Sequence, residues 1–158
     1  MEKERSTWKN ALHELITEMV AAEKVYGTLI QSDRYPTYQT YFKKRHFEQG
    51  DFTKILTDEY HAVTERKLID PFTTDQPIFK PMERQLLEEN LTDAQVNVLV
   101  TDKEQTLVLQ YQNILAFSGM PKTTNALLQS QAEDINSTLQ KLRMDYNTKY
   151  KTGPVKTS

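Results

Sequence analysis

The chain of 158 residues has no cysteine, only four glycines and six prolines. Without cysteine there are no disulfides, no thiolate metal ligands and no cysteine nucleophile. The scarcity of glycine and proline favours long helices over a strand-rich fold. No run of about 18 apolar residues occurs, so no transmembrane helix is expected. The charged start MEKERSTWKN also lacks the apolar core of a signal peptide, and we therefore expect a cytoplasmic protein.

The sequence lacks the residues that several functional classes of protein need. Twenty basic and 22 acidic residues give a net charge of -2, without the basic surplus of a nucleic-acid-binding domain. No glycine-rich phosphate loop, HExxH motif or Ser-His-Asp set is present. The histidines are His13, His46 and His61. The last two lie about 22 Å apart along one predicted helix, so they cannot share the metal of a three-histidine hydrolase. We expect neither a nucleic-acid nor a membrane partner.

Four stretches carry the apolar spacing of amphipathic helices, over about 7–31, 36–67, 92–118 and 123–150. The first has apolar residues that alternate between steps of four and three from Trp8 to Leu29, which is typical of a helix in a bundle. The sequence therefore predicts an all-α protein with one domain over residues 1–150 and a flexible tail over 151–158.

Local signals mark where these helices begin and end. Pro36 is favourable as a first helical residue. Thr92 and Gln95 form a T-x-x-Q capping box at the start of the third helix. Gly119 and Pro121 provide a stop after it. Each predicted helix is thus bounded by residues with a physical reason to end it.

The lengths of the links predict the topology. The first and last links have about four residues each, which makes the helices that they join antiparallel. The crossover 68–91 is long enough to travel back along a helix of about 39 Å. It contains a short predicted helix that Pro81 opens. We expect a ferritin-like four-helix bundle, with two antiparallel hairpins joined by this crossover.

Three glutamates, Glu23, Glu48 and Glu104, fall on the apolar stripes of three different predicted helices. A buried carboxylate is costly unless it is paired, protonated or bound to a metal. In the predicted topology the three lie within about one helical turn of the same height. They are therefore candidate metal ligands, and their oxygen atoms would suit iron or manganese.

A second group of polar residues lies near these glutamates. Di-iron carboxylate bundles use Glu-x-x-His pairs, but the corresponding positions here hold Asp51 and, in the fourth helix, Glu133 with Asn136. Tyr26 and Tyr111 each lie within two turns of a glutamate on the stripe, and a buried tyrosine needs a hydrogen-bond partner. These five residues are second-tier candidates, because both expected histidines are missing.

The missing histidines leave a second interpretation open. The glutamates would then pair with cations, for which Arg45, Lys103 and Arg143 are candidates. The basic run KKRH at 43–46 would be a solvated face. The protein would be a non-enzymatic scaffold or interaction module with a vestigial metal site. A homodimer is also expected, with any other protein partner unknown.

Three segments resemble an uncharacterised bacterial family of ferritin-like four-helix bundles. LHELITEMVAAEKVYGTLI, with Glu23 and Tyr26, is similar to the first helix of that family. HFEQGDFTKIL is similar to the second helix. TDKEQTLVLQYQNIL is similar to the third through Glu104 and Tyr111, although Gln105 replaces a second acid. The resemblance implies a ferritin-like fold and a link to metals or stress, without a defined reaction.

Overall fold

The computed structural model describes residues 7–66 and 77–146. Over these residues the chain forms five α-helices, one short 3-10 helix and no strand. The predicted all-α class is therefore confirmed. In chain order the elements are α2 (Trp8–Ser32), η1 (Pro36–Tyr38), α3 (Gln39–Thr64), α4 (Phe79–Glu88), α5 (Asp93–Leu115) and α6 (Lys122–Tyr146).

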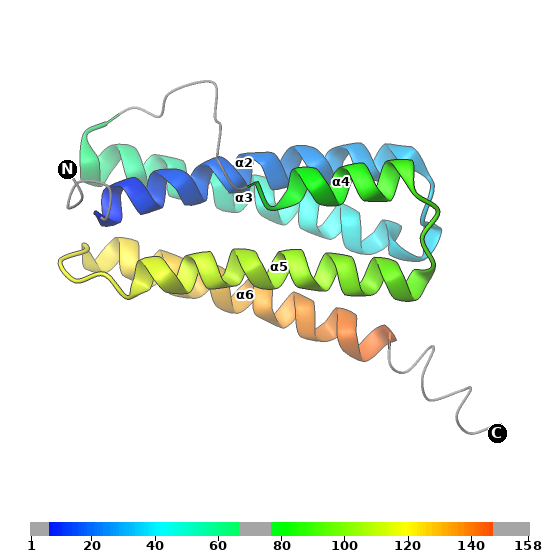
Figure 1. Cartoon of the computed structure of the whole chain (residues 1–158). Coiled ribbons are helices and arrows are strands. Elements are labelled where there is room, and N and C mark those ends of the chain that lie inside the picture. The colour runs from blue at the N-terminus through cyan, green and yellow to red at the C-terminus, as the bar shows by residue number, and fades with distance from the viewer. Residues whose placement is uncertain (1–6, 67–76, 147–158) are drawn as a thin grey trace.

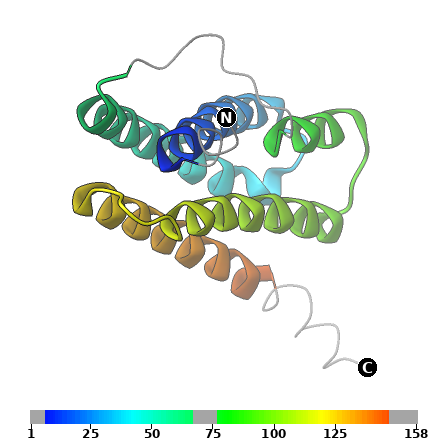
Figure 2. The ribbon, with the colours of Figure 1, turned by 60° about the vertical axis from the view of Figure 1, so that its left-hand side comes forward.

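The long helices form two antiparallel pairs that pack as two layers (Figures 1 and 2). One pair is α2 with α3, and the other is α5 with α6. Because α4 runs back along α2 before α5 begins, α3 and α5 point in the same direction (Figure 1). The short helix α4 packs against both α2 and α5. The layers meet over an apolar core to which all five helices contribute.

The predicted capping box is present in the structure. At the start of α5 the Thr92 hydroxyl accepts from the Gln95 amide at 3.1 Å, and the Gln95 side chain accepts from the Thr92 amide at 2.9 Å. Gly119 has a φ of +82°, in the left-handed region that favours glycine, but it lies in the turn four residues after Leu115, and the C-cap of α5 is Ala116. The helix α2 instead ends at Asp33, which has a φ of 58°.

Helix boundaries differ from the predicted ones by a few residues. Pro36 opens the 3-10 turn η1, and the α-helix itself begins three residues later at Gln39. The crossover helix α4 begins at Phe79, two residues before Pro81. The end of the predicted fourth helix and the tail 151–158 lie outside the described residues. Among the helices that the structure describes, none has the length and hydrophobicity of a membrane span.

Two charged side chains hold the crossover helix α4 at opposite ends. At its start, Glu18 of α2 accepts from the Ile78 amide at 3.0 Å. At its end, Arg34 donates to the carbonyl oxygens of Leu86 at 2.9 Å and Glu89 at 2.8 Å. An acid at the N-terminus and a base at the C-terminus both oppose the partial charges of the helix dipole. The crossover helix α4 is thus fixed by contacts distant in sequence.

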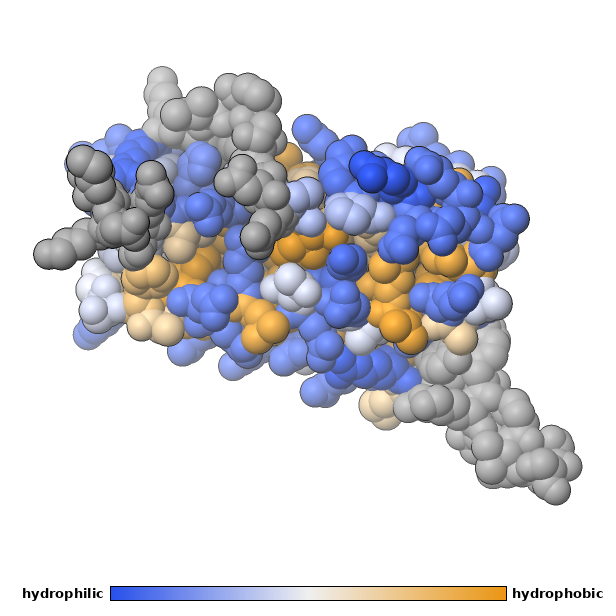
Figure 3. Space-filling model, in the orientation of Figure 1, coloured by the Kyte–Doolittle hydropathy of each residue, from blue (hydrophilic) through white to orange (hydrophobic). Residues whose placement is uncertain are grey.

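The surface is mainly hydrophilic on the face that Figure 3 shows, with hydrophobic residues in a band along α5. Single exposed apolar residues are normal in soluble domains. The interior contains a less usual feature, because the fully buried side chains include Arg45 and Glu104. Glu18 is nearly as deep, at 2% exposure.

Candidate functional site

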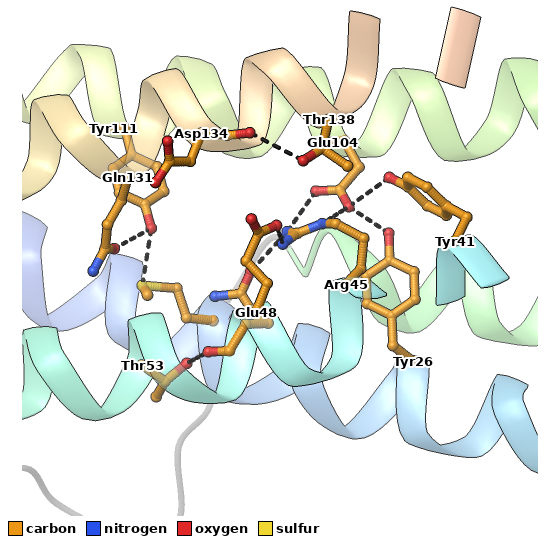
Figure 4. A network of polar contacts seen from close by, with 12 residues as sticks. Tyr26, Tyr41, Arg45, Glu48, Thr53, Glu104, Tyr111, Gln131, Asp134 and Thr138 are labelled. Carbon is orange, nitrogen blue, oxygen red and sulfur yellow. Dashed lines mark hydrogen bonds and ion pairs between the residues drawn. The ribbon is translucent and has the colours of Figure 1, made fainter. Parts of the chain in front are cut away.

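The buried polar centre of the bundle is organised by Arg45, whose side chain has no exposed surface. Its Nε donates to Glu104 Oε2 at 2.5 Å, and its Nη2 donates to Glu104 Oε1 at 3.0 Å (Figure 4). This is the two-point contact that the planar guanidinium makes with a carboxylate. Arg45 also donates to the side chains of Glu48 at 2.8 Å and Gln49 at 2.7 Å, both on its own helix.

Glu104 receives hydrogen bonds from three residues on two helices. Besides Arg45, the hydroxyls of Tyr26 and Tyr41 both donate to its Oε2 atom, at 2.5 and 2.9 Å. Tyr26 comes from α2, whereas Tyr41 and Arg45 come from α3. The guanidinium also lies over the Tyr26 ring, 5.7 Å from its centroid, where a cation is attracted to the ring face. Both carboxylate oxygens of Glu104 are therefore fully engaged inside the protein.

Burial and the ion pair fix the protonation states of this cluster. Burial raises the pKa of Tyr26 and of Tyr41 well above the ordinary value, and the Glu104 charge raises both further. Burial alone would lower the pKa of Arg45, but the adjacent Glu104 outweighs it and the pKa is raised. The tyrosines accordingly stay neutral donors, and Arg45 stays charged.

The structure brings together two of the three predicted ligands. Glu48 and Glu104 both contact Arg45, but only Glu104 is fully buried, because α3 turns Phe42, Arg45 and Gln49 toward the core. Glu48 therefore lies at the edge of the apolar stripe and is half-buried.

Glu23 lies elsewhere. A Cβ atom on Gly50 would meet Glu23 Oε2 at 3.0 Å. Gly50 follows Arg45 by five positions, which turns it about 140° around the helix. The expected convergence of Glu23 with the other two acids is thus not seen.

Of the five second-tier residues, only Tyr26 joins the buried cluster around Arg45 and Glu104. Tyr26 has a carboxylate partner, as expected of a buried tyrosine, but that partner is Glu104 and not the nearby Glu23. Tyr111 instead donates to Gln131 Oε1 at 2.7 Å, and its hydroxyl lies 3.6 Å from Met19 Sδ. The remaining members do not join the buried cluster: Asp51 and Glu133 are exposed, and Asn136 is half-buried.

The sequence places Arg45 in the basic run KKRH and among the cations that could pair with the glutamates. In the structure it is the largest fully buried side chain of the described residues. It lies three residues after Phe42 and eleven before Leu56, both in the core, so its spacing is that of a buried residue. Glu18 carries the same signal, since it follows Leu15 by three residues and precedes Ala22 by four. The basic run KKRH hides the position of Arg45, because the two lysines that precede it are exposed.

The donor set does not fit an iron or manganese ion bound by Glu23, Glu48 and Glu104. In residues 7–66 and 77–146, no three His, Cys, Asp or Glu side chains converge closely enough to hold a metal. The guanidinium of Arg45 lies between Glu48 and Glu104, where a bridging cation would lie. A positive charge from the chain itself thus neutralises the acids.

Comparison of the chain with protein-family models, with curated protein sequences and with solved structures finds no match.

Proposed function

We propose that this protein is a non-enzymatic helical bundle that works by binding protein, its own copies or another chain. The observation that carries the proposal is the closure of the buried cluster. Oε2 of Glu104 accepts from Arg45, Tyr26 and Tyr41, and Oε1 accepts from Arg45, so a substrate or an ion would have to displace the chain's own donors. Arg45 then has the structural role that a bridging metal has in carboxylate bundles.

We also propose that the bundle is ferritin-like in arrangement. The parallel course of α3 and α5 supports this, as does the crossover along α2 (Figure 1). The resemblance of the first three helices to a ferritin-like family points the same way. In that case the cluster is a former metal site in which an arginine has replaced the metal.

Metal binding by Glu23, Glu48 and Glu104 stays a prediction, and it has a defined structural requirement. Arg45 would have to leave Glu104, and a buried arginine without its carboxylate is strongly unfavourable. The ligand Glu23 would also have to leave its position against Gly50. Both changes would have to be offset by the ion.

Elemental analysis tests the two alternatives directly. The purified chain is incubated with ferrous iron or manganese, freed of excess ion, and assayed for retained metal and for its thermal unfolding midpoint. We expect no retained metal and no change of midpoint with metal or chelator. Retention near one equivalent, lost in Glu48→Gln but kept in the control Glu14→Gln at an exposed position outside the candidate ligands, would overturn the proposal.

The binding role needs its own test. Sedimentation of the purified chain and chemical crosslinking in cells that produce it should reveal a specific complex, either of copies or with another protein. A chain that stays monomeric at high concentration and crosslinks to nothing would contradict the proposed function, whatever its metal content.

A further inference from the structure

The hairpin of α5 and α6 carries an unusual distribution of charge. Residues 105–132 contain a single charged residue, Lys122, although 27% of the whole chain is charged. The stretch covers the second half of α5, the turn and the first half of α6. Depletion of charge is the compositional mark of the centre of a protein interface.

The outer side of α6 presents this stretch to solvent. Lys122, Ala126, Gln129 and Glu133 are all exposed. They are spaced by four, three and four residues, so they share one stripe of the helix. We call these four residues the α6 stripe. The other faces of α6 pack on α5 and α3, which leaves the stripe as the free side of the bundle.

The α6 stripe has opposite charges at its two ends and none between. Lys122 and Glu133 lie eleven residues apart, about 16 Å along the helix, so they are too far apart to pair within one chain. Lys122 is moreover the first residue of α6, where a cation is unfavourable to the helix dipole. Stability of the isolated helix therefore does not explain its position.

We propose that a second copy of this chain binds the α6 stripe in antiparallel orientation, which specifies the partner under the proposed function. A two-fold axis between Ala126 and Gln129 would place Lys122 of each copy opposite Glu133 of the other. Such an isologous contact uses the same patch twice. The small Ala126 near the axis permits close approach of the helices, which need about 8–10 Å between axes.

Charge complementarity favours a copy over an unrelated partner. The stripe has a positive residue at its N-terminal end and a negative residue at its C-terminal end. An antiparallel copy presents these charges in the opposite order, so that unlike charges face each other. The neutral surroundings on α5 add no like-charge repulsion between copies. The stripe is only about 16 Å long, so the contact belongs to the small, weak class of interfaces.

Charge reversal tests this arrangement by sedimentation equilibrium of the full chain. Lys122→Glu and Glu133→Lys should each weaken self-association by about tenfold, because two attractive pairs become repulsive. The double variant Lys122→Glu with Glu133→Lys should restore it, since each new pair is attractive again. Lys141→Glu, an exposed lysine on the same helix, is the matched control and should leave association unchanged.

The outcomes separate this inference from the proposed function. A dimer that ignores both single reversals, or a double variant weaker than either, would overturn the antiparallel α6 contact while leaving a binding role intact. A monomer at all concentrations would overturn it as well, and crosslinking to a different protein would still support the broader proposal. Bound metal would count against the proposed function alone.

Discussion

Arg45 and Glu104 show how a buried charge is tolerated at the scale of a residue. The pair satisfies its own charges and takes two tyrosine hydroxyls as well. Such a pair need not contribute much net stability, because desolvation offsets the attraction. Breaking it from one side, however, leaves a bare charge in the core.

A double-mutant cycle measures this asymmetry. Arg45→Met alone leaves Glu104 without its cation and should lower the free energy of unfolding by about 3–5 kcal/mol. Adding Glu104→Gln removes the uncompensated charge and keeps an oxygen that can accept from Tyr26. The double variant should therefore be more stable than Arg45→Met in urea unfolding. Simple additivity of the two single changes would contradict a functioning ion pair.

Glu18 predicts a dependence of stability on pH. Burial raises the pKa of Glu18 above its ordinary value of 4.5, although the hydrogen bond from Ile78 partly opposes this. The folded state therefore binds the proton more tightly than the unfolded state. Its contribution to stability is greatest below pH 4.5 and is lost as pH rises through the raised pKa.

Glu18→Gln removes this loss and keeps an acceptor for the Ile78 amide. The variant should be more stable than the natural chain at pH 7, and the difference should shrink toward pH 4. Urea unfolding at both pH values measures this, with the exposed Glu14→Gln as a control for loss of one carboxylate. A Gln variant that is less stable at pH 7 would show that the charged form is the stabilising one.

Residue spacing identified one of the two buried acids in the described residues, Glu104, and missed Glu18. It also placed Glu23 and Glu48 inward, although both are half-buried. The need of a buried tyrosine for an acceptor predicted a carboxylate partner for Tyr26, but the partner is Glu104 on α5 and not Glu23, the acid nearby on the same helix.

The group that neutralises Glu104 depends on how α3 is rotated about its own axis. A rotation by about one residue turns Arg45 toward the core in place of Glu48. That rotation decides between Arg45 and Glu48, and helical spacing alone does not fix it.

At the scale of an element, α2 and α3 approach each other through reciprocal contacts at two glycines. The His46 ring lies over Gly27, and the Glu23 carboxylate lies over Gly50; an added Cβ would meet them at 3.1 and 3.0 Å. The two neighbours differ in freedom. The ring of His46 is held by a hydrogen bond from its Nδ1 to the Glu23 carbonyl oxygen, at 2.9 Å, whereas the half-exposed carboxylate can swing away.

These two glycines form a matched pair of tests. Alanine favours a helix over glycine by about 1 kcal/mol. Gly50→Ala should gain up to about that amount in the free energy of unfolding, because only a flexible side-chain end must move. Gly27→Ala should gain less or lose stability, since the ring must leave its hydrogen bond. Thermal or urea unfolding decides, and a greater gain at Gly27 would contradict the assigned contacts.

The crossover helix α4 depends on contacts that its own sequence does not reveal. Ten residues form a marginal helix in isolation, and Arg34 closes its C-terminal end through two carbonyl oxygens. Arg34→Lys keeps the charge and loses the planar fork. We expect amide hydrogen exchange in Phe79–Glu88 to speed up by about tenfold with little change in α2. Uniform acceleration throughout the bundle would instead mean that α4 unfolds only with the whole chain.

The long helices were the predictable elements, and α4 shows why the rest was harder. Capping at Thr92 acts locally, so the sequence around it suffices. Gly119 lies in the turn that follows α5, four residues beyond the last helical residue. The start of α4 depends instead on Glu18, sixty residues earlier in the chain. Pro36 illustrates the same limit, because packing of Tyr38 in the core accompanies a 3-10 turn before α3 begins.

At the scale of the whole molecule, the buried cluster joins the two layers. Glu104 belongs to the α5–α6 hairpin, and all three of its donors belong to the α2–α3 hairpin. Because the three donors converge on one carboxylate, the cluster fixes how far one layer is shifted along the other. Apolar packing alone defines this register less well. The cluster is therefore a specificity device in this bundle as much as a source of stability.

The same buried phenols make the protein an optical reporter of its own unfolding in alkali. Burial raises the pKa values of Tyr26, Tyr41 and Tyr111, so these rings should not form phenolate while the bundle is intact. In an absorbance titration at a phenolate wavelength, they should ionise in one cooperative step that coincides with loss of helical circular dichroism. Above about pH 10 the unfolded chain releases these protons more readily, and alkali should therefore drive the layers apart.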